Sequence, residues 1–296
     1  MKRLMMLGVV LSLGGSMMTG CSRAHVESMT AMNEGVGYAQ AGRTVEAIEK
    51  LQAAAALEPT NHQVFFQMAI VHMMDHHYEA ARDDLNHAIA VDPNNAAYQE
   101  KLGTVLIELS DWAAAKTAFE KAIQLDPNNF KSYYKLGRVH EQLAQNEDGN
   151  ENLQAALRRY TEAVQKGPRF LEAYSALGRL YADLGYLEQA VQTLQAATQV
   201  ALEGTDEAAT VHELLGSVYQ QQNKPEDAIR EFRAALAIDP GMGGALFSLG
   251  WAFAQQGNRD EATRLLKKFV DSAGTQEHQD YVRAARNKLS ELAETN

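Results

Sequence analysis

The sequence contains few of the residues that mark disulfide-bonded, low-complexity or nucleic-acid-binding proteins. Its 296 residues include a single cysteine, Cys21, so no disulfide framework can form within the chain. Six prolines and 21 glycines are too few for a low-complexity chain. The 27 Lys and Arg are outnumbered by 38 Asp and Glu, which gives a net charge of −11. Because phosphate-backbone binding needs a surplus of cations, we expect no nucleic-acid partner and no electrostatic attachment to anionic lipid.

The first twenty residues have the layout of an export signal. Lys2 and Arg3 precede an apolar run from Leu4 to Leu13, and small residues follow. This run is too short for a membrane-spanning helix and suits a secretory signal peptide over residues 1–20. Cys21 stands directly after Met18-Thr19-Gly20, which resembles the lipobox of bacterial lipoproteins. The alternative is a simple secretory peptide followed by an incidental thiol.

The lipoprotein resemblance implies that Cys21 is lipidated and becomes the N-terminus of the mature protein. Two or more acyl chains hold a protein stably at a membrane, whereas one gives marginal binding. Ser22 rather than aspartate follows the cysteine. By the same resemblance, we expect a lipid anchor on the periplasmic face of the outer membrane, a linker over residues 21–27, and no cofactor other than the lipid.

The remainder of the chain repeats one pattern. Pro59, Pro93 and Pro127 are spaced 34 residues apart, and their surroundings recur, as in 91–95 and 125–129. This period and content resemble tetratricopeptide repeats, which are helix–turn–helix units that stack into a solenoid. The resemblance implies an all-α, right-handed α-solenoid of about seven repeats over residues 28–276. The expected repeats are 28–61, 62–95, 96–129, 130–170, 171–208, 209–242 and 243–276.

Small and large residues recur at fixed places in these repeats. A glycine in the first helix costs about 0.5–1 kcal/mol relative to alanine, so its recurrence predicts that the helices approach closely there. The second helix carries an alanine and, four residues later, a large side chain, which predicts a packed stripe. The glycines are Gly35, Gly103, Gly137, Gly178, Gly216 and Gly250. The alanines are Ala47, Ala81, Ala115, Ala156, Ala190, Ala228 and Ala262, and the large residues are Leu51, Leu85, Phe119, Tyr160, Leu194, Phe232 and Leu266.

Three segments depart from the regular repeat. The fourth repeat gains an acidic stretch near 145–151, which we expect to form a loop, and the fifth runs on through 203–206 without a proline. Solenoids tolerate such insertions because each repeat contacts only its neighbours. Residues 277–296 are expected to form a capping helix and tail, with Tyr281, Ala285 and Leu289 on the face that covers the last repeat.

The resemblance implies that the first helices line a concave groove in which a protein or peptide segment binds. Exposed apolar side chains generally mark interaction sites, and methionine suits an adaptable surface. The alternative is that the methionines pack between helices or under the linker, and that the C-terminal helix covers Trp251. Some repeat proteins bind the carboxylate of a chaperone tail through Lys and Asn in the groove. The comparable positions here hold Val36, Phe66 and Ile70, so we do not expect this class of ligand. The candidate groove residues are Met29, Met32, Val36, Phe66, Ile70, Met73, Met74, Tyr134, Arg138, Arg179, Phe247 and Trp251, with Lys131, Glu100, Glu108 and Glu172 beside them.

The densest cluster of possible metal ligands in the sequence consists of His72, Asp75, His76 and His77. His72 and His76 are one helical turn apart, a spacing that can support zinc. However, His72 occupies a core-facing repeat position and His76 and His77 fall in a turn, while His87 with Asp83 and Asp84 suits a solvated helix face. The sequence contains no phosphate-binding glycine loop, nucleophile elbow or zinc-protease motif. We therefore expect no metal site and no enzymatic activity.

The sequence leaves three functions open. The first is a membrane-tethered scaffold that assists assembly of an envelope complex, and its general resemblance is to the pilotins of type IV pilus systems, which act on a secretin. The second is an adaptor that recruits peptidoglycan-remodelling enzymes or proteases. The third is a metal-dependent enzyme that uses His72 and His76.

Overall fold

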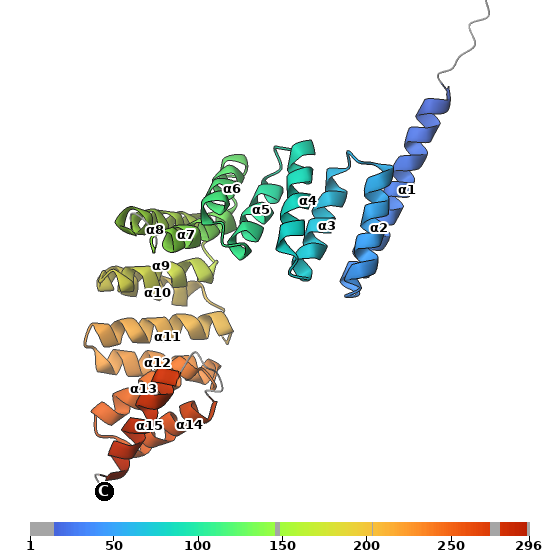
Figure 1. Cartoon of the computed structure of the whole chain (residues 1–296). Helices are drawn as coiled ribbons and strands as arrows, with labels where there is room; N and C mark the ends of the chain where they lie inside the picture. Colours follow the sequence, from blue (N-terminus) through green and yellow to red (C-terminus); the bar gives the residue numbers. More distant parts are fainter. Residues whose placement is uncertain (1–14, 146–148, 203, 273–278, 295–296) are drawn as a thin grey trace, which may run out of the picture. The chain divides into compact units, whose positions relative to one another are not determined.

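The computed structural model describes residues 15–145, 149–202, 204–272 and 279–294, and the side chains from residue 23 onward. In these ranges the chain is built of α-helices and contains no strand. The structure divides into two compact units, residues 1–127 and 128–296. In each unit consecutive helices lie side by side as hairpins that stack on one another (Figure 1). The all-α repeat fold expected from the 34-residue period is confirmed.

The helices have the following bounds. The N-terminal unit contains α1 (Gly15–Gln40), α2 (Thr44–Leu57), α3 (His62–Met74), α4 (Tyr78–Val91), α5 (Ala96–Glu108) and α6 (Trp112–Leu125). The C-terminal unit contains α7 (Phe130–Leu143), α8 (Gly149–Lys166), α9 (Leu171–Asp183), α10 (Leu187–Val200), α11 (Asp206–Gln221), α12 (Pro225–Ile238), α13 (Gly243–Gln255), α14 (Arg259–Ser272) and α15 (Gln279–Glu294).

The repeated motif residues set where the helices begin and end. The second helices α2, α4 and α6 each end two residues before a proline, because the residue that precedes proline is pushed out of the helical region. The next helix then begins with an asparagine cap. The side-chain oxygens of Asn61 and Asn95 accept hydrogen bonds of 3.2 and 3.1 Å from the backbone N–H groups of Gln63 and Ala97. Each such cap satisfies a donor that the helix itself leaves unpaired.

The recurring glycines lie against the large residues of the partner helix. A Cβ atom at Gly103 would stand 2.8 Å from the Phe119 ring, and one at Gly178 would stand 2.6 Å from Cγ of Leu194. The same contact joins Gly35 to Leu51, Gly137 to Tyr160, Gly216 to Phe232 and Gly250 to Leu266. The expected close approach of the two helices is therefore present. At each of these glycines, the space that a Cβ atom would need is filled by the large side chain of the second helix.

The ends and the insertions differ from the expectations in several places. Residues 21–27, expected as a linker, are helical and belong to α1, which starts 13 residues before the expected first repeat. Residues 149–151, expected in a loop, form the first turn of α8. The expectations for residues 146–148, Glu203, residues 277–278 and the signal-peptide residues 1–14 lie outside the described residues. None of the described helices has the length and hydrophobicity needed to cross a membrane.

The C-terminal helix packs as the capping prediction requires. Ala285 of α15 is fully buried, and Val282, Leu289 and Leu292 pack against the core formed by α10 to α14. Tyr281 is exposed over about half of its surface but lies against the Phe247 ring at 5.2 Å. The face predicted from the sequence is the face that contacts the last repeat.

Candidate partner-binding groove

The candidate residues of α1 contribute mainly to packing. Met32 is 8% exposed and lies in a core formed with Leu51, Val64 and Met68. Met29 packs against this core and Val36 is half-buried. The interpretation of Met32 as a partner contact is therefore not supported, because the neighbouring helices already cover its side chain.

The candidates of α3 divide between packing against the core and exposed surface. Phe66 and Met73 pack against a core that contains Ala69 and Leu85, and the Phe66 ring lies 4.8 Å from that of Tyr98. Ile70 is half-buried. Met74 is 49% exposed, and among the four candidate methionines, all of which the structure describes, it alone is an exposed residue. Substitutions at Phe66 or Met73 would therefore disturb packing as well as any surface.

The last two candidates are covered by the chain itself. Phe247 contacts the rings of Tyr281 at 5.2 Å and Phe269 at 5.4 Å, and it stacks on Trp251 at 5.6 Å. The ammonium of Lys288, on α15, lies 5.0 Å from the centre of the Trp251 ring. The alternative that the C-terminal helix covers Trp251 is thus what the structure shows.

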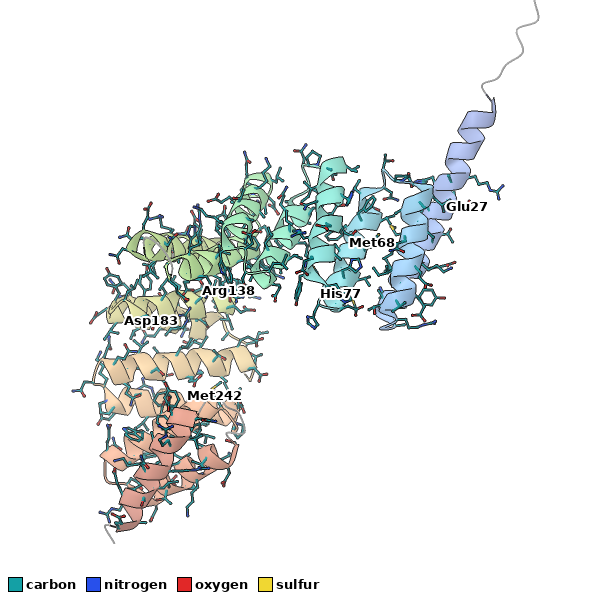
Figure 2. The ribbon with its side chains drawn as sticks, in the orientation of Figure 1. Glu27, Met68, His77, Arg138, Asp183 and Met242 are labelled. Atoms are coloured by element: carbon teal, nitrogen blue, oxygen red, sulfur yellow. The ribbon has the colours of Figure 1, made fainter. Side chains whose placement is uncertain are left out.

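The middle candidates lie together in an open groove of the C-terminal unit. Side chains from α7, α8, α9 and α11 enclose a volume of about 840 Å³, within the range of ligand-binding clefts. Two of the lining residues, Arg138 of α7 and Asp183 of α9, are labelled in Figure 2. The groove is lined by Tyr134, Arg138, Glu141, Gln142, Ala144, Gln145, Leu153, Tyr160, Leu171, Glu172, Ser175, Ala176, Arg179, Leu180, Asp183, Leu184, Glu207, Thr210 and Leu214.

A charged network holds the middle of this groove in place. Arg179 donates to both carboxylate oxygens of Glu141, at 2.8 and 3.1 Å, and to Asp183 at 3.1 Å. The Tyr160 hydroxyl also donates to Glu141. Burial and the Glu141 charge raise the pKa of Tyr160 far above its usual range, so the hydroxyl stays protonated and remains a donor. Burial likewise raises the pKa of Tyr134, whose ring lies 5.8 Å from that of Tyr160.

Some lining residues were missed from the sequence. Tyr160 was assigned to the packed stripe alone, and Glu207, Thr210 and Leu214 of α11 were not considered. Tyr160 does both, since its ring is fully buried against Gly137 while its hydroxyl reaches the groove. Glu141 could have pointed to this part of the groove from the sequence. It stands four residues after the repeated Gly137, so it lies on the same helix face as Gly137 and Arg138.

Two half-buried histidines pair with buried carboxylates of the following helix. Nδ1 of His72 lies 2.8 Å from Oδ2 of Asp84, and Nδ1 of His212 lies 2.8 Å from Oε2 of Glu231. Asp84 is buried, so its assignment to a solvated face was wrong. His76 lies in the turn between α3 and α4, as its repeat position implied, and its φ there is 58°. No cluster of three or more His, Cys, Asp or Glu suited to a metal is found among the described residues.

Comparison with known proteins identifies the repeat. Family models described as tetratricopeptide repeats match residues 38–103, 103–143, 169–241 and 213–277. No curated protein matches the sequence.

Solved structures share the fold at low sequence identity. A tetratricopeptide repeat protein from Parabacteroides merdae is 14% identical, with 90% of this chain and 99% of that chain covered and a TM-score of 0.61. PilF from Pseudomonas aeruginosa is 18% identical, covers 76% of this chain and 96% of its own, and has a TM-score of 0.59. YrrB, described as having an unusual peptide-binding site, is 22% identical over 68% and 97% of the two chains, with a TM-score of 0.50.

Proposed function

The chain is a tetratricopeptide repeat protein. We propose that it is a non-catalytic scaffold that binds a segment of a partner protein in the groove formed by α7, α8, α9 and α11. The observation that carries this proposal is the open volume of about 840 Å³ along α9, with exposed charge at its rim and apolar side chains at its floor. A groove of this size accommodates several side chains of an extended segment. The peptide-binding site named for YrrB is consistent with this use of the fold.

The groove can be blocked without disturbing the core. Ser175 lies on α9, is half-buried, and lines the groove, so Ser175→Trp should fill it. Gln192→Trp, on an exposed position of α10, is the matched control. We expect Ser175→Trp to reduce crosslinking to the partner in intact envelopes at least about tenfold, in line with the loss of a central contact. Equal crosslinking by both variants, with unchanged circular dichroism, would exclude the groove as the binding site.

In the same proposal, Cys21 carries the lipid that holds the protein on the periplasmic face of the outer membrane. The support is the sequence of residues 1–21, with its two cations, apolar run and single cysteine. Fractionation of cells expressing Cys21→Ser tests it. The variant should be found in the soluble periplasmic fraction, while Ser22→Ala, one residue away, should remain with the outer membrane. Membrane attachment of Cys21→Ser would contradict the lipid anchor.

The partner that we propose is a component of an envelope complex such as a type IV pilus secretin. The support is the combination of a lipobox with a body made of repeats, as in the pilotins. Secretin multimers should be reduced when the gene is deleted and restored by the unaltered chain but not by Ser175→Trp. Normal multimers in the deletion strain would remove the secretin from consideration while leaving the groove proposal intact.

A further inference from the structure

The groove of the C-terminal unit has an apolar floor. Leu171, Ala176 and Leu180 of α9 line it together with Leu214 of α11. The Tyr134 ring adds a half-buried aromatic surface at its α7 side. Apolar side chains of a bound segment can therefore lose contact with water along the whole length of α9.

Of the groove's two arginines, one is already neutralised. Arg179 is held by Glu141 and Asp183, so its charge and those of its partners are largely satisfied within the network. Arg138 is exposed, and no ion pair is found for it within the described part of the chain. It remains as a cation on the α7 side of the groove.

Two carboxylates of the same groove have no such partner. Glu172 of α9 and Glu207 of α11 are both exposed, and among the described contacts neither makes an ion pair or a side-chain hydrogen bond. Both also line a neighbouring cavity of about 290 Å³, which places them at the boundary between the two spaces. Arg169 lines that second cavity but not the groove itself.

The charges of the groove are thus unbalanced toward acid. Its lining contains two arginines, Arg138 and Arg179, against four carboxylates, Glu141, Glu172, Asp183 and Glu207. The unpaired negative charge lies on Glu172 and Glu207. The apolar residue Leu171 lines the same two cavities as these carboxylates. The net charge of −11 on the whole chain adds a long-range attraction for cationic partners.

On these grounds, and resting on the proposed function, we propose that the groove selects a basic segment: an extended stretch that carries arginine or lysine next to apolar side chains. The cationic side chain lies between Glu172 and Glu207, and its aliphatic stem and apolar neighbours lie on Leu171, Ala176 and Leu214. Long cationic side chains suit such a site, because their methylene groups pack on apolar surface while the charged end pairs with carboxylates.

Fluorescence anisotropy with the full chain tests this selectivity. The probes are three fluorescein-labelled twelve-residue peptides of leucine, alanine and serine that differ only at two positions, which are Arg, Gln or Glu. Two exposed charge pairs correspond to about 3- to 30-fold in affinity, so we expect the Arg peptide to bind that much more tightly than the Gln peptide. The preference should weaken as salt is raised from 0.05 to 0.5 M, because the pairs are exposed.

Matched variants assign the preference to two side chains. Glu172→Gln with Glu207→Gln should bring the affinities for the Arg and Gln peptides within about twofold of each other. The control, Glu188→Gln with Glu226→Gln, removes the same charge from exposed positions on α10 and α12 and should keep the preference. Ser175→Trp should abolish binding of all three peptides.

The outcomes separate this inference from the proposed function. Binding that Ser175→Trp blocks, but that is equal for the three peptides or favours the Glu peptide, overturns the selectivity and keeps the groove as the binding site. A preference for Arg that survives in the Glu172→Gln, Glu207→Gln variant also overturns it. Failure of every peptide to bind the full chain overturns both proposals.

Discussion

At the scale of single residues, the contacts of the repeated glycines explain why this fold retains them. Helix propensity alone favours alanine by about 0.5–1 kcal/mol, so a glycine with free space around it lowers the stability of the helix. Gly103 is constrained because a Cβ atom would meet three atoms of the fully buried Phe119 ring within 3 Å. Gly37, in α1, has no heavy atom within 4 Å of the Cβ position. The two glycines therefore predict opposite effects of the same substitution.

We predict that Gly103→Ala lowers the free energy of unfolding by about 1–3 kcal/mol, since the Phe119 ring must shift in a packed core. Gly37→Ala should raise it by about 0.5–1 kcal/mol. Urea denaturation of both variants, followed by circular dichroism, provides the comparison. A stabilised Gly103→Ala would show that the ring moves freely and that the close approach has no energetic consequence.

Much of this residue-level structure could be predicted from the sequence. The recurrence of glycine predicted a close approach, and the alanines that were assigned to the core are buried, from Ala47 through Ala262. The sequence did not predict which atom the glycine meets, because the period fixes the positions within a helix but not the angle between helices. Met32 shows the same limit, since a first-helix position faces either the groove or the next repeat according to that angle.

At the scale of helix pairs, two buried carboxylates at the same repeat position differ in their surroundings. Asp84 and Glu231 each stand three residues after the repeated alanine and each pair with a histidine of the preceding helix. Burial raises the pKa of Asp84, and the hydrogen bond from His72 only partly offsets this. Burial acts on Glu231 in the same sense, but hydrogen bonds from His212 and Arg230 outweigh it and the pKa is lowered. Only Glu231 is therefore stabilising as a carboxylate.

Glu231→Gln should reduce the free energy of unfolding by about 1–2 kcal/mol at pH 7, since it weakens charge-assisted hydrogen bonds. Because the folded-state pKa lies below the ordinary value of 4.5, this stabilisation is full above that value and is lost as the pH falls through the folded-state pKa. The difference between the variant and the unaltered chain, measured in urea from pH 7 down to pH 3, should shrink accordingly.

Glu261→Gln serves as the control for this titration. Its carboxylate forms an exposed pair with Arg264 at 2.6 Å, and such pairs contribute at most about 1 kcal/mol. Its effect should be small at every pH. A Glu231→Gln effect that does not change with pH would contradict the assignment of Glu231 as a stabilising carboxylate.

At the scale of the whole molecule, the two units each have their own cores, and the groove lies entirely within residues 128–296. The sequence predicted one array of repeats over residues 28–276, because a period carries no information on where a chain divides into compact units. Seven of the twelve groove candidates, from Met29 to Met74, also lie in the first two expected repeats, whereas the groove of about 840 Å³ lies around the fourth to sixth. The difference arises because Met32, Phe66 and Met73 are needed for packing between helices.

The cap on the last repeat can be tested by undocking α15. Leu289→Asp should release this helix from the core, whereas Arg286→Asp changes an exposed position of the same helix. In a Trp112→Phe background, the emission of Trp251 should shift to longer wavelength only in Leu289→Asp, because Lys288 of α15 no longer covers the indole. An unchanged spectrum in both variants would show that α15 does not protect the last repeat.

The central claim, that the groove of the C-terminal unit holds a partner segment, is tested most directly by photocrosslinking in the native envelope. A photoreactive amino acid replaces either Arg138, in the groove, or Arg158, on an exposed position of α8 outside it. We predict one discrete adduct from position 138 that Ser175→Trp abolishes, and none from position 158. The same adduct from both positions, or an adduct that persists in Ser175→Trp, would contradict the account.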